Sequence, residues 1–184
     1  GCFQMFVGVE SFRRKTLIAA RKAQNHPEVY GEIVRLCKKY KIQSHFSNII
    51  GFPEDTPEEV DEHVGILKGL NPTVASFYIL TPIPGTEQYD EFLAAGWITE
   101  QNLDRFDAQS LTWKHPHFSK ASLEALLFEC HRKFYTLRRT ASMAADSFIR
   151  NPFSTDALVT LNQPVFSRYS AYRRRHPMSG GIGL

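Results

Sequence analysis

The sequence predicts an α/β fold with parallel strands, followed by a mostly helical C-terminal extension. Three apolar runs, rich in β-branched and aromatic residues, alternate with segments whose apolar side chains recur at helical spacing. Each run ends in a turn that leads directly into a helix. Strands and helices that alternate in this way pair in parallel through crossover connections. The strand and helix units occupy residues 1–98, and the extension occupies residues 99–184.

The first unit begins with residues 2–9, which are almost continuously apolar, as is typical of a strand buried on both faces. Glu10 and Ser11 end this strand, either as residues of a binding site or as helix-capping groups. Helices are expected over residues 13–22 and 27–40.

The second unit has a strand over residues 42–50, a Gly-Phe-Pro-Glu turn and a helix over residues 57–70. Thr56 suits the N-cap, Pro57 suits the first helical position, and Glu59 completes a capping box. The sequence therefore predicts a turn that is held firmly from its helical side.

The third unit has a strand over residues 73–81, a proline-rich turn and a helix over residues 87–95 that Gly96 closes. A short strand is possible over residues 110–113.

In the extension, a long helix begins at Ser119 or Ser122. Its expected inner face consists of Leu123, Leu126, Leu127, Cys130, Phe134 and Leu137. Weaker helical signals follow, with breaks at Asn151-Pro152 and Gln163-Pro164.

Charge and cysteine content narrow the functional classes. The net charge of +3 does not indicate a nucleic-acid-binding protein. Residues 132–175 carry nine Arg or Lys against two Asp, a net of +7, which forms either a solvated face or a surface for an anionic substrate or an acidic membrane. Three widely spaced cysteines argue against a disulfide framework and favour a reducing, cytoplasmic setting.

No metal site or membrane span is predicted. His115, His117 and His131 lack nearby carboxylate or thiolate partners for zinc. No apolar run approaches the roughly 20 residues that cross a bilayer. The sequence opens inside an apolar strand without Met, so we expect a piece of a longer protein.

Three strand ends together resemble a known family. The segments Gly-Val-Glu-Ser-Phe at residues 8–12, Asn-Ile-Ile-Gly-Phe-Pro-Glu-Asp-Thr at 48–56 and Leu-Thr-Pro-Ile-Pro-Gly-Thr at 80–86 resemble the fourth, fifth and sixth strands of radical S-adenosylmethionine enzymes. Residues 1–98 would then be the C-terminal half of a TIM-like (β/α) barrel. The region after it is similar to the cobalamin-binding branch, which contains methylases and cyclases, and could cap a small-molecule substrate.

The resemblance implies a cofactor site at these strand ends. Glu10 and Ser11 would hydrogen-bond the ribose or the amino-acid part of S-adenosylmethionine, since a carboxylate can accept from two hydroxyls. Ile49 would pack on the adenine, and Gly51 would allow the backbone to approach it. Ser47 stands where the family has its first glycine.

Further roles follow from the same resemblance. Leu80, Thr81 and Pro82 would offer backbone groups to the adenine edge, with Tyr78 nearby, and Glu54 would fix the turn rather than touch the ligand.

The family's cluster motif, Cys-x3-Cys-x2-Cys, is absent. The resemblance therefore implies that the ligands of the 4Fe-4S cluster, the first three barrel units and a possible cobalamin domain lie upstream. The complete enzyme would cleave S-adenosylmethionine reductively to a 5'-deoxyadenosyl radical, with electrons from a flavodoxin or ferredoxin. This chain would not be active alone.

Two alternatives remain open on the sequence. One is a non-radical α/β-barrel enzyme in which Glu10 and Glu54 serve as acid and base. The other is a non-catalytic binding module that uses the basic C-terminal segment. A truncated sheet would leave the strand over residues 2–9 as an open edge, which predicts poor solubility of the isolated chain.

Overall fold

The computed structural model describes residues 1–150 and 155–177. The strands are β1 (Gln4–Glu10), β2 (Gln43–Ile50) and β3 (Val74–Ile79). The α-helices are α1 (Arg14–Ala19), α2 (Tyr30–Lys39), α3 (Pro57–Leu70), α4 (Glu87–Ala94), α5 (Lys120–Phe134), α6 (Leu137–Arg150) and α7 (Thr155–Tyr172). Two short 3-10 helices are η1 (Pro27–Val29) and η2 (Leu103–Arg105).

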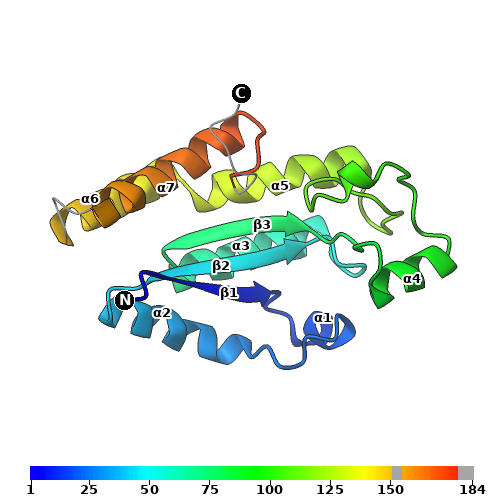
Figure 1. The fold of residues 1–184 in the computed structure, drawn as a ribbon, viewed down its shortest axis with the longest axis horizontal. Coiled ribbons are helices and arrows are strands. Elements are labelled where there is room, and N and C mark those ends of the chain that lie inside the picture. Colours follow the sequence, from blue (N-terminus) through cyan, green and yellow to red (C-terminus); the bar gives the residue numbers. More distant parts are fainter. Residues whose placement is uncertain (151–154, 178–184) are drawn as a thin grey trace.

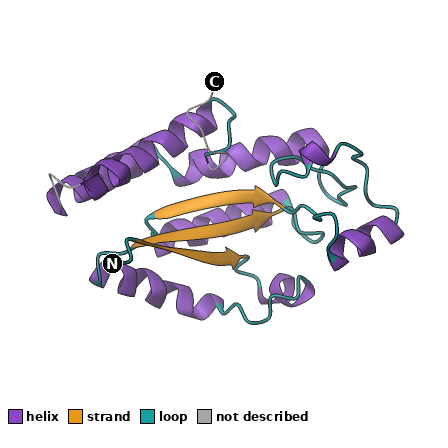
Figure 2. Ribbon diagram, in the orientation of Figure 1, coloured by secondary structure: helices purple, strands orange, loops and turns teal. Residues whose placement is uncertain are grey.

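The strands form one parallel sheet in the order β1-β2-β3, which confirms the predicted α/β class and parallel pairing (Figure 2). Glu10 pairs with Asn48, and Ile49 pairs with Tyr78. The carboxyl ends of the three strands therefore meet at one edge of the sheet. Closure of these strands into a TIM-like barrel stays a prediction.

Helices cover the sheet and its β3 side (Figure 1). Helix α2 packs on β2, and α5 packs on both β3 and α3. The continuous core is built from both predicted parts of the chain. Its most deeply buried members include Val9, Phe46, Phe77, Trp113, Leu123, Leu127 and Phe134. The division of the chain into two domains, residues 1–98 and 99–184, stays a prediction.

The helix-start chemistry of α3 is confirmed. The Thr56 hydroxyl accepts from the Glu59 N–H at 3.4 Å, and the Glu59 carboxylate accepts from the Thr56 N–H at 2.9 Å. Pro57 occupies the first turn, where a missing N–H costs nothing. The helix ends at Asn71, whose φ of 56° gives a left-handed cap. Both ends of α3 therefore lie where the sequence places them.

The extension departs from the sequence prediction at three points. Residues 110–113 contribute one isolated bridge, between Ile98 and Trp113, rather than a strand. Leu137 begins α6 and is exposed, because the long helix already ends at Phe134. Helix α7 continues through Pro164 instead of breaking there. The predicted break at Asn151-Pro152 lies outside the described residues.

The first strand is not buried on both faces, contrary to the prediction. Phe3, Met5 and Phe6 have exposed fractions of 59%, 44% and 60%. The physical reason is topology, because β1 is the edge of the sheet and no other described strand pairs with its far side. Poor solubility stays a prediction that this apolar edge supports.

The opposite edge of the sheet, along β3, is covered by the extension. The Tyr135 hydroxyl accepts from the Ala75 N–H at 3.0 Å and donates to the Ala75 carbonyl at 2.9 Å. His176 contacts the Phe77 carbonyl at 2.6 Å, and the Ile79 N–H donates to the carbonyl of Ala108 at 2.7 Å. These contacts satisfy backbone groups that a neighbouring strand would otherwise bind.

We expect Tyr135→Phe to lower the free energy of unfolding by about 1 to 3 kcal/mol, because it leaves the buried N–H and C=O of Ala75 without their partner. Urea unfolding measures the change. Tyr172→Phe, at an exposed tyrosine, is the matched control. Equal stability of the two variants would contradict the assigned role of the Tyr135 hydroxyl.

Parts of the basic segment bind the chain itself. Arg139 donates to the Pro72 carbonyl at 2.7 Å, and Arg168 donates to the Tyr135 carbonyl at 2.6 Å. These two guanidinium groups therefore have structural roles. No helix among the described residues has the length and apolar character that crossing a membrane requires.

Candidate functional site

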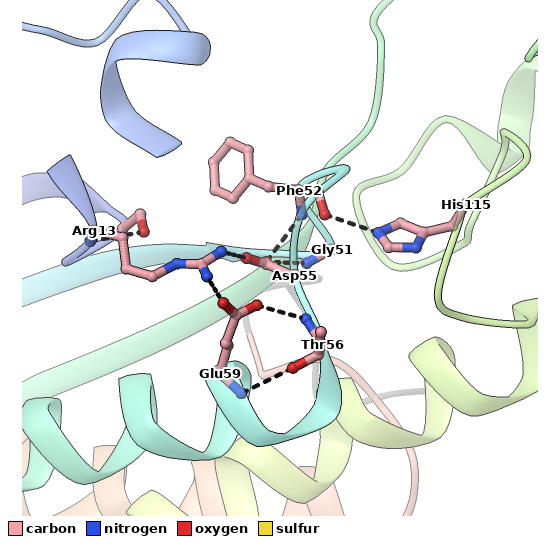
Figure 3. Close-up of polar contacts among 8 residues, drawn as sticks. Arg13, Gly51, Phe52, Asp55, Thr56, Glu59 and His115 are labelled. Atoms are coloured by element: carbon pink, nitrogen blue, oxygen red, sulfur yellow. Dashed lines mark hydrogen bonds and ion pairs between the residues drawn. The ribbon is translucent and has the colours of Figure 1, made fainter. Parts of the chain in front are cut away.

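The turn between β2 and α3 is held by a buried carboxylate (Figure 3). One oxygen of Asp55 accepts from the N–H of Gly51 at 2.9 Å and from the N–H of Phe52 at 3.0 Å. The prediction that Glu54 fixes this turn is wrong, because Glu54 is exposed and its neighbour makes these bonds. The rigid turn places backbone atoms at the carboxyl end of β2.

A cation from the first unit reaches the same carboxylate. The Arg13 guanidinium lies 2.7 Å from the second oxygen of Asp55 and also pairs with Glu59. Burial raises the pKa of Asp55, and the hydrogen bonds from the turn and the charge of Arg13 oppose this rise. The turn after β2 is therefore tied to the loop after β1 (Figure 3).

A third contact comes from the extension. His115 donates from Nε2 to the Phe52 carbonyl at 2.8 Å, and its Nδ1 accepts from the N–H groups of His117 and Phe118. Burial lowers the pKa of His115, which favours this neutral form. The His115 side chain therefore fixes a loop of the extension onto the turn, whereas the His131 ring lies within α5, on the Leu127 carbonyl at 3.0 Å.

Gly51 has a structural explanation that does not involve a ligand. Its φ of +77° is in the left-handed region, and a Cβ atom there would lie 2.6 Å from the Leu123 side chain on α5. The glycine thus allows a helix to approach the turn. The predicted close approach of a cofactor to Gly51 is an additional, untested role.

The carboxyl end of β1 is distorted. Glu10 has a φ of 61° and follows a bulge in the pairing with β2. Its carboxylate folds back beside Gly8 and lies 4.0 Å from the Lys22 ammonium. Burial raises the pKa of Glu10, and Lys22 partly offsets this. Such strain in a non-glycine residue is often found at functional sites.

Ser11, the next residue, is almost fully buried. Its oxygen accepts from the N–H of Arg13 at 3.1 Å, which leaves the hydroxyl proton as a possible donor. Ser47, by contrast, lies in the middle of the sheet between Gly8 and Ser76.

Backbone groups that follow the end of β3 are hydrogen-bonded within the fold. The Leu80 N–H donates to the Ile50 carbonyl at 2.9 Å, and the Leu80 carbonyl accepts from the Trp113 indole at 3.0 Å. The predicted offer of the Leu80 N–H to an adenine does not fit this geometry. Thr81 is buried with its hydroxyl on the Ile79 carbonyl, and Pro82 is buried beside it.

A cavity of about 260 Å³ opens beside the ends of β1 and β2. Its walls bring together two of the predicted cofactor-binding residues, Ser11 and Ile49. The other predicted residues do not line it. The remaining walls come from the loop after β1, the end of β2, the turn after it and α3, including Phe12, Arg13, Asp55, Glu59, Glu62 and His63.

The charges of this cavity favour a cationic ligand. Three carboxylates, on Asp55, Glu59 and Glu62, face one guanidinium, on Arg13, which gives a net charge of −2. His63 adds no charge near neutrality, because burial lowers its pKa to about 4. The wall residues thus suit a sulfonium group, and Ser11 and Ile49 supply a hydroxyl and an apolar surface.

The cysteines of this chain do not fit an iron-sulfur cluster. Cys2 is exposed, whereas Cys37 and Cys130 are buried on two different helices, α2 and α5, and Cys130 lies on the inner face that the sequence predicts. Burial raises the pKa of Cys130 to about 12, so its thiol stays protonated. Within residues 1–150 and 155–177, no group of three or more His, Cys, Asp or Glu side chains could hold a metal ion.

Buried histidines make the fold sensitive to acid. Burial lowers the pKa of His45 and His63 to about 4 and that of His131 to about 3. The unfolded chain binds these protons near pH 6.5, so between pH 6.5 and 4 the unfolded state holds more protons. We expect the free energy of unfolding to fall through this window, by at most about 1.4 kcal/mol per pH unit for each histidine.

Urea unfolding at several pH values measures this dependence. His63→Gln should reduce the slope, since glutamine cannot take up a proton but can still reach Asn48, which His63 now contacts at 2.9 Å. A flat profile between pH 6.5 and 4 would contradict the expectation.

Sequence reasoning missed three residues of this region: Arg13, Asp55 and His115. Asp55 had a detectable signal, because an Asp that follows a Gly-x-Pro-Glu turn can bind the N–H groups of that turn. The long-range contacts of Arg13 and His115 have no counterpart in local spacing.

The chain is similar in sequence to two curated methyltransferases. No protein-family profile matches the chain. It is 26% identical over 183 residues to a bacteriochlorophyllide d C-8(2)-methyltransferase of Chlorobaculum tepidum, an alignment that covers 97% of this chain and 40% of the relative. It is 30% identical over 135 residues to an uncharacterised methyltransferase of Pyrococcus horikoshii, covering 73% of this chain and 29% of the relative. The chain therefore spans less than half the length of these relatives.

Among solved structures, the chain is similar to the radical S-adenosylmethionine methyltransferase TsrM from Kitasatospora setae, which was solved with cobalamin and a 4Fe-4S cluster bound. The identity is 26%, and the match covers 73% of this chain and 26% of that one, with a TM-score of 0.47.

Proposed function

We propose that this chain is part of an S-adenosylmethionine-dependent methyltransferase and supplies part of its cofactor site. The observation that carries the proposal is the similarity to a curated methyltransferase along 97% of the chain. The cavity at the ends of β1 and β2 supports it, because Ser11 and Ile49 were assigned to the cofactor from sequence alone and share that cavity.

Different residues of the cavity would bind different parts of the cofactor. Ser11 would donate its hydroxyl proton to a ribose or carboxylate oxygen, and Ile49 would exclude water from one face of the adenine. Asp55, Glu59 and Glu62 would favour the positive sulfonium over the neutral product, S-adenosylhomocysteine. The bound cofactor would supply the methyl group.

For the complete enzyme, we propose the radical route that the three strand-end motifs indicate, in which one S-adenosylmethionine would be cleaved to methionine and the 5'-deoxyadenosyl radical and a second would donate the methyl group. The cluster would be held by residues outside this chain, because the three thiols described above do not fit it. Cobalamin, a flavodoxin or ferredoxin as reductant, and a small-molecule substrate belong to the same proposal. The roles of Glu10, Thr81 and Pro82 at the cofactor also remain part of it.

Binding of S-adenosylmethionine to the full-length protein, measured by calorimetry, tests the proposal. We expect Ile49→Ala to weaken binding about tenfold, since it removes apolar surface from the wall without changing the charge of the cavity. Ser122→Ala, at an exposed serine of α5, is the control. Absence of binding by the unaltered protein would overturn the proposal. Release of 5'-deoxyadenosine would support the radical route, and formation of S-adenosylhomocysteine without it would contradict that route.

A further inference from the structure

One side chain joins the two loops that border the cavity. The Arg13 backbone N–H bonds Ser11 in the loop after β1, whereas its guanidinium reaches Asp55 in the turn after β2. The guanidinium has two partners, Asp55 and Glu59. Asp55 lies 42 residues further along the sequence than Arg13, and Glu59 lies in the first turn of α3. Ser11, Arg13, Asp55 and Glu59 all line the cavity.

The connection is stiff because each end is held by more than one bond. Asp55 is 6% exposed and receives two backbone N–H groups as well as Arg13. Glu59 is fixed by the capping box of α3. A guanidinium that bridges two such carboxylates in fork geometry has little freedom, unlike a lysine ammonium. Movement of either loop would therefore separate the Arg13 guanidinium from Asp55, which is buried, and from Glu59, which is partly exposed.

We propose that Arg13 is a positioning residue for the cofactor site: it holds Ser11 and the Gly51–Phe52 turn at a fixed separation. The inference rests on the proposed function, in which Ser11 binds the cofactor. Arg13 would act through Ser11 and Asp55. Its guanidinium is already paired with the carboxylates of Asp55 and Glu59. The positive charge of the cofactor would therefore be attracted by Glu62 and by the net negative charge that the three paired groups retain.

The test compares three variants of the full-length protein. Arg13→Gln removes the cation, and Arg13→Lys keeps the charge without the fork. Arg21→Gln is the matched control, because it removes an exposed arginine that pairs with Glu87 and Glu91 and does not line the cavity. Hydrogen exchange is followed in peptides covering residues 10–13, 51–56 and 74–79, together with S-adenosylmethionine binding by calorimetry.

We expect Arg13→Gln to speed exchange about tenfold or more in residues 10–13 and 51–56 and to leave residues 74–79 unchanged. It should also weaken S-adenosylmethionine binding about tenfold, with partial recovery in Arg13→Lys and no effect of Arg21→Gln. Unchanged exchange in residues 51–56 would overturn the connection itself.

The remaining outcomes are also decisive. Faster exchange with undiminished binding would overturn the positioning role while leaving the proposed function intact. If the unaltered protein does not bind S-adenosylmethionine, the proposed function fails, and with it the role of Arg13 at a cofactor site. The exchange data would still show whether Arg13 joins the loops.

Discussion

Gly51→Ala should lower the free energy of unfolding by about 2 to 5 kcal/mol, one of the largest effects of any single methyl group in this chain. Two costs add: a side chain at a φ of +77° is strained, and the new Cβ would lie 2.6 Å from Leu123. Leu123 is fully buried and cannot move aside freely. Urea unfolding monitored by tryptophan fluorescence measures the loss.

The matched control for this change is Gly85→Ala. Gly85 also has a positive φ, of +84°, but nothing lies within 4 Å of the place that a Cβ atom would take there. It should therefore show the backbone cost alone, about 1 to 2 kcal/mol. The double variant Gly51→Ala with Leu123→Ala should lose less stability than the sum of the losses of the two single variants, because the clash between residues 51 and 123 is gone. Equal losses at Gly51 and Gly85 would show that the contact with Leu123 is unimportant.

Asp55→Ala should cost about 2 to 4 kcal/mol, because it leaves the N–H groups of Gly51 and Phe52 without an acceptor and removes a partner of Arg13. Asp55→Asn should cost less. Its amide oxygen can still accept from the turn, and burial already raises the pKa of the carboxyl, which disfavours its charged form.

Thermal and urea unfolding of the two variants separate these contributions. Glu54→Ala, at the exposed neighbour, should be close to neutral and is the control. If Glu54→Ala were as damaging as Asp55→Ala, the assignment of the turn to Asp55 would be wrong. Comparable losses for Asp55→Ala and Asp55→Asn would indicate that the charge, rather than the acceptor, holds the turn.

The local features of the fold could be predicted from the sequence, because their causes are local. Thr56, Pro57 and Glu59 are three neighbours that together define a helix start, and α3 begins where they place it. The three apolar runs and their turns likewise determined the order of the units and their parallel pairing. Pro164 shows the limit, since a proline disfavours but does not forbid a continuing helix.

The cavity could be predicted only in part, for a physical reason. Ser11 and Ile49 were assigned through strand-end motifs, and parallel pairing brings such ends together. Arg13 and His63 enter from a loop and from a helix face, and their contacts depend on how the elements pack in three dimensions. The same is true of Leu80, whose backbone groups were expected to be free but are taken by Ile50 and Trp113.

The contrast between the two borders of the sheet has a consequence for self-association. Along β3, Tyr135, His176 and Ala108 bind backbone groups of the strand, while β1 presents Met5 and Phe6 beside an edge that no described strand occupies. Within residues 1–150 and 155–177, β1 is therefore the strand edge through which copies of this chain can pair. A pair formed by two β1 edges uses both of these edges, so strand pairing by itself should give a dimer, which sedimentation would detect.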